Sequence, residues 1–453
     1  MARSFWPMVM FGTAASALAG CAGSGGGAPP APPVLQSQRM PIQQSAATKP
    51  GIATAPKDTA ANRREALLLA PAVDRKARFA AARSSMRTLS SSASRINGCT
   101  PLNVADPAAN GLTAKLILTH AASHLDVDGT NCDLAVYIPA GENVSINDSL
   151  VGGAGTAQIA ADANANLNVQ DTHINAGQQT VGIYFFQDGT GTIGNSDIKV
   201  LDPAPWNALP IQQSLGPAGI IGPSSGELSV NTLRIDMAQN ATGILALGTT
   251  NVEHLDVESH FVPAYGSSQF LSPGIFTAGT TRIRDSLFND VTTDGFGIGM
   301  TFESGGSGSS SNTVVRADFV GHAIIFSGNV SVDRSFVSMP LPTPPFGTYG
   351  VRMICYTGCT GNTSVHNVIV QGNGYHDPTT PDFANDSIGF QFSYPVDLRD
   401  NLANHNSVGF YSCNSPNITS SPQLQALLTQ AGNRAVNNTS TGFFAGFTFN
   451  DCQ

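Results

Sequence analysis

The chain has 453 residues, a formal net charge of −9, 12% charged residues and 47 glycines. Low charge with abundant glycine is typical of turn-rich β-structure and argues against a helical protein. Residues 1–98 contain 12 Lys and Arg against 3 Asp and Glu, whereas residues 99–453 contain 10 against 28. The acidic body argues against nucleic acid as a partner, and the basic N-terminal part suits an anionic membrane surface.

The chain begins with a targeting segment, residues 1–20. Arg3 precedes an apolar run from Phe5 to Leu18, and Leu18-Ala19-Gly20-Cys21 resembles the bacterial lipobox. The resemblance implies cleavage before Cys21 and lipidation of this cysteine. With Ala22 next, it also implies an outer-membrane lipoprotein on the periplasmic or cell-surface face. The alternative is an ordinary secretory signal followed by an unrelated cysteine.

Two segments separate this anchor from the body. Residues 21–57 are rich in Gly, Ala, Pro, Ser and Gln and carry few large apolar residues, so we expect a disordered tether. In residues 58–98 apolar residues recur at helical spacing, with a break at Pro71. This pattern predicts a helical segment that caps the body, forms a stem or lies on the membrane surface.

Six cysteines remain once Cys21 is assigned to lipid, which favours disulfides in an exported chain. The sequence leaves their pairing open. We predict the pairs Cys99 with Cys132, Cys355 with Cys359, and Cys413 with Cys452. The alternative for Cys355 and Cys359 is zinc, but a second nearby pair is missing.

The acidic stretch Asp126 to Asp133, DVDGTNCD, opens the body and allows two interpretations. Clustered carboxylates suit calcium. However, Gly129 comes too early for an EF-hand, and Asp-Gly is a common turn signal, so we favour the turn. We expect no cofactor and no other metal site.

A phrase of the form apolar-x-polar recurs through residues 99–453. Its occurrences are Ile146-x-Asp148, Val169-x-Asp171, Ile193-x-Asn195, Val230-x-Thr232, Val252-x-His254, Ile283-x-Asp285, Val314-x-Arg316, Val332-x-Arg334, Val365-x-Asn367, Leu398-x-Asp400 and Ala435-x-Asn437. A polar residue at the third position suits a tight bend, because Asn and Asp tolerate left-handed backbone angles.

A second phrase places a small residue before an apolar one. Its occurrences are Gly182-Ile183, Gly243-Ile244, Gly274-Ile275, Gly295-Phe296, Ala323-Ile324, Gly350-Val351, Gly389-Phe390, Gly409-Phe410 and Gly442-Phe443. From Gly243 to Val252, and again from Gly274 to Ile283, the step to the first phrase is nine residues. This constant spacing predicts a coil of short strands that pairs in parallel with its successor.

With these two phrases, residues 99–453 resemble the right-handed parallel β-helix proteins, the fold of pectin and pectate lyases. The resemblance implies an all-β, single-stranded right-handed parallel β-helix of about eleven coils, preceded by the N-terminal helical segment. About 4.8 Å per coil gives an axis of roughly 50 Å. The ends of such a stack need covers, and Pro422 to Ala431 is a candidate for one of them.

In this family substrates lie along the strand that carries the second phrase and beside the loops before it. The loops here are long and aromatic, which suits sugar rings. We expect ligand-binding residues among Trp206, Phe261, Tyr265, Tyr349, Tyr375 and Phe383. The alternative is that these aromatic residues only pin their loops to the stack.

Alternation along this strand predicts which residues point outward. They are Tyr184, Leu245, Phe276, Gly297, Ile325, Arg352, Gln391, Tyr411 and Phe444. This row has no carboxylate, whereas an inverting hydrolase needs two and the pectate lyases hold calcium with acids. If the chain is a lyase, we expect Arg352, His376 and Asp377 to be catalytic, with Arg352 holding a uronate carboxylate.

These observations favour a non-catalytic surface lipoprotein that binds an envelope or other polysaccharide, or serves adhesion or structure. The alternative is a polysaccharide lyase or glycoside hydrolase of the pectin lyase-like fold, which rests on fold analogy. The expected partners are a glycan and, through the lipid, a membrane.

Overall fold

The structure is a computed structural model. It describes residues 98–107, 109–176, 180–200, 217–238, 241–260, 271–290, 296–302, 307–317, 322–326, 329–339, 348–353, 362–379, 383, 386–393, 396–413 and 418–446. The predicted signal, tether and helical segment, residues 1–97, lie outside these ranges. The predictions made for them stay predictions.

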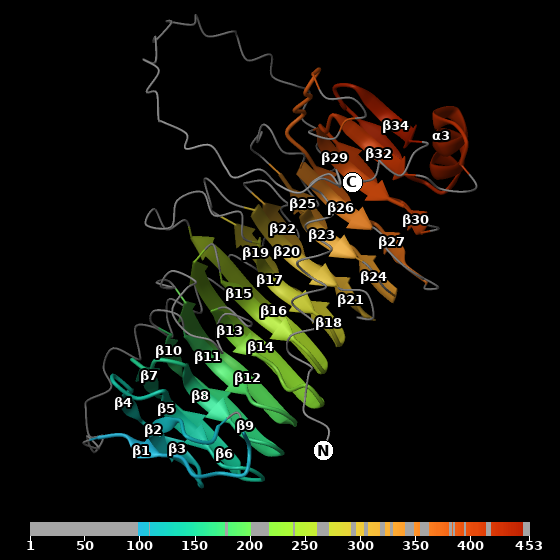
Figure 1. Cartoon of the computed structure of the whole chain (residues 1–453). Coiled ribbons are helices and arrows are strands. Elements are labelled where there is room, and N and C mark those ends of the chain that lie inside the picture. Colours follow the sequence, from blue (N-terminus) through green and yellow to red (C-terminus); the bar gives the residue numbers. More distant parts are fainter. Residues whose placement is uncertain are drawn as a thin grey trace, which may run out of the picture.

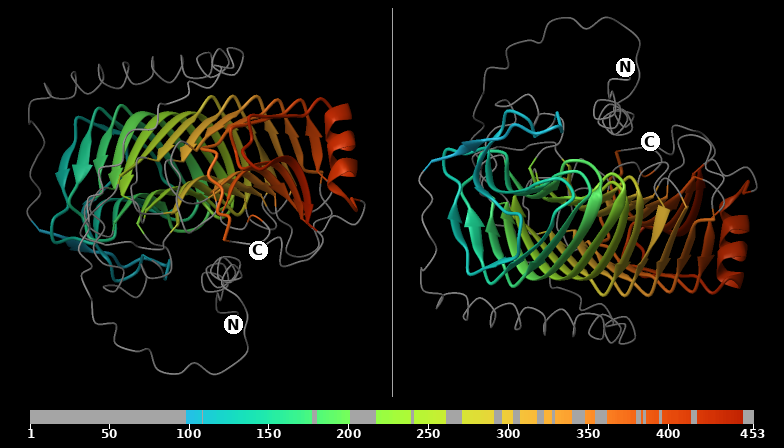
Figure 2. Two further views of the ribbon diagram at one scale, coloured as in Figure 1. Left: turned by 90° about the horizontal axis from the view of Figure 1, so that it is seen from above. Right: turned by 90° about the horizontal axis from the view of Figure 1, so that it is seen from below.

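The described residues form mostly β-strands in two long sheets that run side by side along one axis (Figures 1 and 2). The first sheet has 14 described strands. They are β1 (Thr100–Pro101), β2 (Thr113–Ile117), β5 (Leu134–Ile138), β8 (Ala157–Ala161), β11 (Val181–Phe185), β13 (Ala218–Ile221), β15 (Thr242–Ala246), β17 (Leu271–Thr277), β20 (Phe296–Phe302), β23 (His322–Phe326), β26 (Thr348–Met353), β29 (Ser387–Phe392), β32 (Val408–Cys413) and β34 (Thr441–Gly446).

The second sheet has 20 described strands and contains the bend predicted from the first phrase. They are β3 (Ala122–Ser123), β4 (Asp126–Asp128), β6 (Asn143–Asn147), β7 (Leu150–Gly152), β9 (Ala165–Gln170), β10 (His173–Asn175), β12 (Gly189–Val200), β14 (Gly226–Ala238), β16 (Thr249–His260), β18 (Thr280–Arg284), β19 (Leu287–Asp290), β21 (Ser307–Ser311), β22 (Val314–Ala317), β24 (Asn329–Asp333), β25 (Phe336–Ser338), β27 (Ser364–His366), β28 (Ile369–Gln371), β30 (Asp397–Arg399), β31 (Leu402–Asn404) and β33 (Arg434–Val436).

Apart from the β1–β2 pair, each described strand pairs in parallel with the equivalent strand of the next coil, as the repeat predicts. The residues between the sheets form one continuous apolar core. Within it like side chains stack: the Phe390 and Phe410 rings lie 4.8 Å apart at 5°, and Phe443 continues the stack 5.4 Å further on. This arrangement is compatible with a parallel β-helix.

The bend residues form a row along the second sheet, and their backbones are left-handed. The described members with positive φ are His124, Asp148, Asp171, Asn195, Thr232, His254, Asp285, Asn312, Arg334, Asn367 and Asp400. The bend predicted at Arg316 was wrong, because Asn312 takes that place. Ala435-x-Asn437 was also misplaced: Ala435 pairs with Ala403 after the bend, and Gly432 follows Asp400 in the row.

The second phrase needs two corrections. Ile220 pairs with Ile183 and Ile244, so Ala218–Ile221 adds a strand that the prediction omitted. In β20 it is Met300, and not Phe296, that pairs with Ile275, while Phe296 pairs with Leu271. The sequence TDGFGIGM has three glycines before apolar residues, and the wrong one was chosen.

Both ends of the described stack are closed. At the N-terminal end β1 pairs antiparallel with β2, and a disulfide joins Cys99 to Cys132, as predicted. At the C-terminal end lies α3 (Ser421–Gln430), which packs against β34 (Figure 1). Its Leu424 and Leu428 side chains are buried, so the stretch predicted as a cover is a helix with its apolar side on the core. Among the described residues no helix has the length and hydropathy needed to cross a bilayer.

Candidate functional site

The outward row of the first sheet agrees with the predicted alternation. Cα pairing runs from Tyr184 through Ile221, Leu245 and Phe276, and later from Ile325 through Arg352, Gln391, Tyr411 and Phe444. Thr301 pairs with Phe276 and so takes the place in the row that was predicted for Gly297. The reason is the shifted pairing of β20 described above. Burial raises the pKa of Tyr184 to about 12, with a smaller contribution from Asp106, so this phenol stays neutral at physiological pH.

Arg352 is in this row but is buried, with only 2% of its surface exposed. Its guanidinium lies 4.7 Å from the centroid of the Tyr349 ring, and Tyr349 is itself 5% exposed. A cation over an aromatic face is a stabilising contact for a desolvated arginine. The two predicted residues therefore meet, but in a buried contact and not at an open surface. The catalytic assignment of Arg352 stays a prediction.

The long loop between β28 and β29 brings His376 to Asp386. The Nδ1 atom of His376 lies 2.8 Å from Asp386 Oδ2, and the side chain of His376 is 41% exposed whereas that of Asp386 is fully buried. Asp386 immediately precedes β29, and the backbone N–H of Ser387 donates to the Tyr375 carbonyl at 3.0 Å. These contacts hold the loop against the rigid end of the strand.

Asp386 is anchored by further hydrogen bonds. The backbone N–H of Asp377 donates to its Oδ1 at 2.8 Å, and the Ser407 hydroxyl donates to its Oδ2. Ser407 and Ser440 are also hydrogen-bonded through their hydroxyls at 2.8 Å. A buried carboxylate with several donors is a fixed acceptor, so it orients His376 through Nδ1. In that tautomer the imidazole Nε2 can accept a proton, as a general base does.

Asp377 has a local role in the structure. Its carboxylate accepts hydrogen bonds from the Thr379 backbone N–H at 2.9 Å and from the Thr379 hydroxyl at 2.6 Å, which is a turn contact. Its backbone N–H supports Asp386, as described above. Of the predicted catalytic residues, His376 contacts Asp386 through its side chain, and Asp377 contacts it through its backbone N–H.

Aromatic side chains lie beside this histidine. The Phe383 ring is 6.0 Å from the His376 ring and packs edge-on against Phe444 at 4.8 Å. Phe444 stacks in turn on Tyr411 at 5.2 Å. Phe383 has a φ of 60°, an uncommon conformation for a bulky residue that is frequent at functional sites. We call Phe383, Phe444 and Tyr411, with His376, the aromatic platform.

Most of the other predicted residues lie outside the described ranges. Cys413 is buried, but its predicted partner Cys452 lies outside the described residues, as do Cys21, Cys355, Cys359, Trp206, Phe261 and Tyr265. Tyr375 is half-buried, and its backbone N–H donates to Asn373 Oδ1 at 2.9 Å.

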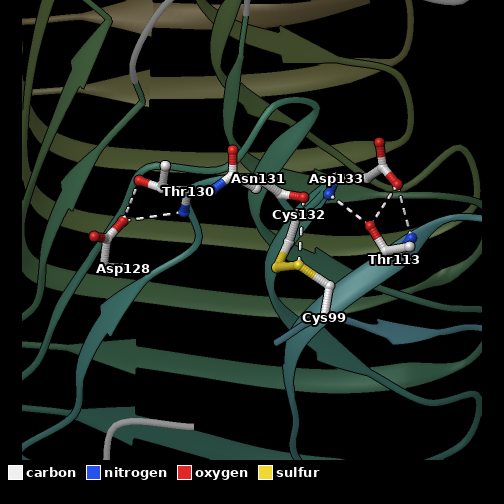
Figure 3. Close-up of a disulfide and its surroundings, with 7 residues drawn as sticks. All are labelled: Cys99, Thr113, Asp128, Thr130, Asn131, Cys132 and Asp133. Carbon is white, nitrogen blue, oxygen red and sulfur yellow. Dashed lines mark hydrogen bonds between the residues drawn. A yellow bond between two sulfur atoms is a disulfide. The ribbon is translucent and has the colours of Figure 1, made fainter. Parts of the chain in front are cut away.

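The Asp126–Asp133 stretch forms the short strand β4 followed by a turn, as favoured (Figure 3). The Asp128 carboxylate accepts the Thr130 backbone N–H at 3.0 Å, and the Asp133 carboxylate accepts the Thr113 backbone N–H and hydroxyl, both at 2.8 Å. The Cys132 N–H closes the turn onto the Gly129 carbonyl at 2.8 Å. The turn places Cys132 against Cys99.

One group of possible metal ligands was missed. Potential ligand atoms of Glu253, His254 and Asp285 lie within 4.8 Å of one another. Val252-x-His254 and Ile283-x-Asp285 occupy the same position of the repeat in adjacent coils, so stacking them would have predicted the contact. Arg284 already donates to Glu253 at 3.3 Å, which competes with a cation for that carboxylate.

Comparison with known proteins does not name a relative: no family model, no curated protein and no solved structure matches the chain.

Proposed function

We propose that the chain is an outer-membrane lipoprotein whose body is a single-stranded right-handed parallel β-helix of about eleven coils. In this proposal the body binds a polysaccharide without cleaving it, and the lipid on Cys21 holds it at the membrane. The strand register and the stacked core support the β-helix. The lipobox-like sequence supports the anchor, which mass spectrometry of the mature N-terminus would test by detecting acyl chains on Cys21.

The observation that carries the binding proposal is the aromatic platform. Phe383 and Phe444 offer apolar ring surface next to His376, whose imidazole is exposed and can exchange hydrogen bonds with sugar hydroxyls. In the described part of the outward row, Arg352 is the only charged residue, and it is buried. The described row has no pair of carboxylates for hydrolysis, and among its members whose burial is described only Tyr184, Phe276 and Phe444 are partly exposed.

Binding can be tested with the full mature chain carrying Cys21→Ser, which removes lipidation. It should bind one or more members of a panel of uronate and neutral polysaccharides, and Phe444→Ala should weaken that binding about tenfold. Tyr184→Ala is the matched control, because Tyr184 is a half-buried aromatic residue of the same row far along the axis. Equal loss from both variants would contradict the platform.

A polysaccharide lyase is the second candidate, and the His376–Asp386 contact is what favours it. Elimination from a uronate needs a base for the C5 proton, and an oriented, exposed histidine can supply one. The substrate carboxylate would then need a cation, and Arg352 is the predicted one. Release of unsaturated sugars that stops in His376→Ala, with binding retained, would establish the lyase and overturn the non-catalytic proposal.

A further inference from the structure

The outward face of the second sheet carries an apolar stripe. Phe288, Val315, Val337, Val370 and Ala403 point into the central core, so the residues just before them point outward. These preceding residues form a separate apolar cluster, Leu287, Val314, Phe336, Ile369 and Leu402, which we call the stripe. They pair in register over five successive coils.

The stripe is not a solvent-exposed surface. Its members are only 1–5% exposed, although they lie on the outer side of the sheet. Within the described residues, their cluster includes only each other and the partly buried Val436. An outward row of isolated apolar side chains would keep more of its surface in water, so another part of the chain must cover it.

The same row continues toward the N-terminal end as an acidic patch. Asp256 pairs with Leu287, Arg234 with Asp256, and Asp197 with Arg234. Asp236 lies two residues after Arg234, and Glu258 lies two residues after Asp256. Both accept hydrogen bonds from Arg234, at 2.7 and 2.6 Å.

The balance of charge in the acidic patch favours a basic occupant. Asp197, Asp236 and Asp256 are nearly buried, and each takes part in interactions beyond these contacts. Four carboxylates face Arg234 and the half-buried Lys199, with His173 bonded to Asp197. Buried carboxylates need cationic partners, so the cover of this face should be basic as well as apolar.

We propose that residues 58–95 of the same chain dock along this face. This segment has eight Lys and Arg against three Asp and Glu, and it carries apolar residues at helical spacing. It directly precedes Cys99, which the disulfide ties to Cys132 at the N-terminal end of the stack. Its charge is thus opposite to that of the patch, and its attachment point is fixed.

The lengths also match. A helix rises about 1.5 Å per residue and coils are about 4.8 Å apart, so each coil takes roughly three helical residues. We place Cys99 at the coil of Asp126 and count back along the segment. This ratio then places Arg87 near Asp197 and Arg83 near Asp256. It places Phe79 near Leu287 and Val73 near Phe336, and the break at Pro71 ends the stretch to which the ratio applies. In this register Arg87 and Arg83 lie opposite the acidic patch and Phe79 and Val73 opposite the stripe, with Arg75, Lys76 and Arg78 between these two apolar residues.

Limited trypsin digestion of the full mature chain carrying Cys21→Ser tests the docking. Cleavage after Arg75, Arg78, Arg83 and Arg87 should be at least about tenfold slower than after Arg39 and Lys57 in the predicted tether. Arg83→Glu with Arg87→Glu should abolish the protection at Arg75 and Arg78, whereas Arg83→Lys with Arg87→Lys should keep it. Equal cleavage of both segments, or protection that survives charge reversal, would overturn the proposal.

Cysteine cross-linking tests the register. Phe79→Cys with Leu287→Cys should form a disulfide under mild oxidation, and the control pair Phe79→Cys with Leu402→Cys, four coils away, should not. Failure of the first pair in a folded variant, or equal yield from both, would reject this register. Cross-links that appear between two chains and fade on dilution would show that a second copy covers the stripe, which would also overturn the proposal. None of these outcomes depends on glycan binding.

Discussion

The side-chain oxygen of Asn433 accepts hydrogen bonds from both the backbone N–H and the side-chain amide of Asn401, at 3.1 and 2.9 Å. Asn401 also donates to the Val365 carbonyl at 2.8 Å and accepts the Val368 N–H at 2.9 Å. Asn433 donates to the Leu428 carbonyl in the last turn of α3 at 3.0 Å. These two buried residues connect three coils to the C-terminal cover.

We predict that Asn401→Ala lowers the free energy of unfolding by about 2–4 kcal/mol, because it leaves several buried backbone groups without partners. Chemical denaturation measures this loss. Asn166→Ala is the control, since Asn166 is exposed on β9, and its effect should stay within about 0.5 kcal/mol. Similar losses at both positions would contradict the role of the buried pair.

Asn401 has smaller counterparts in earlier coils. Ser335 accepts the Thr313 N–H at 3.3 Å, and Ser286 accepts the Leu255 N–H at 3.2 Å, each from the residue after a bend. Each hydroxyl also donates to the carbonyl two residues before it. The position directly after a bend therefore needs a hydrogen-bonding side chain whenever the backbone of the coil before it leaves an N–H unpaired.

Gly243 is a second position where the stacking is restrictive. A Cβ atom there would lie 2.2 Å from the carbonyl oxygen of Gly274 in the next coil, and this oxygen belongs to the sheet backbone. We predict that Gly243→Ala lowers the free energy of unfolding by about 3 kcal/mol or more, because the strands must separate. Gly155→Ala is the control. Its Cβ would have 3.6 Å of clearance, so it should be neutral or slightly stabilising in the same denaturation assay.

The bend row shows how much of the fold the sequence predicts. The first phrase identified most bend residues, because an apolar core residue two places before a left-handed polar residue is a strong local pattern. The pattern failed at Asn312, where Ser310 takes the inward place and bonds to Thr313 at 3.0 Å. No apolar residue marked that strand. It failed again at the last coil, where α3 replaces the strand before Gly432.

The sequence pointed to His376 and Asp377 in one aromatic loop, but the contact between His376 and Asp386 was not predicted. Ser407 and Ser440 come from later coils. Only the register shows that Ile388, Val408 and Thr441 stack, which brings Ser407 to Asp386 and Ser440 to Ser407. A serine two residues before the glycine of the second phrase was the signal available, at Ser387, Ser407 and Ser440.

Asp171 gives a prediction for pH. Burial, and then the nearby carboxylate of Asp148, raise the pKa of Asp171 above its ordinary value of 3.8. A raised carboxyl pKa means that ionisation destabilises the folded state, so this penalty is present at neutral pH and vanishes below the ordinary value. Asp171→Asn should therefore raise the free energy of unfolding by about 0.2–1 kcal/mol at pH 7 and leave it unchanged at pH 3.

The cause can be separated by a double-mutant cycle. Asn suits the left-handed bend, as Asn195 shows with a φ of 44° in the next coil. If repulsion contributes, Asp148→Asn alone should also stabilise the protein at pH 7, and the double variant should gain less than the sum of the two. If the stability gains of the two single variants add strictly, burial alone raises the pKa of Asp171.

The Cys99–Cys132 disulfide should stabilise one end of the stack more than the whole. It closes a sequence separation of 33 residues, for which chain entropy gives about 3–4 kcal/mol. In a repeat structure each coil contacts mainly its neighbours, so loss of the bond should act locally. In Cys99→Ser with Cys132→Ser, amide hydrogen exchange should speed up in β2 and β5 and stay unchanged in β29 and β32. Uniform loss of protection would instead show that the stack unfolds as one cooperative unit and that its N-terminal end limits its stability.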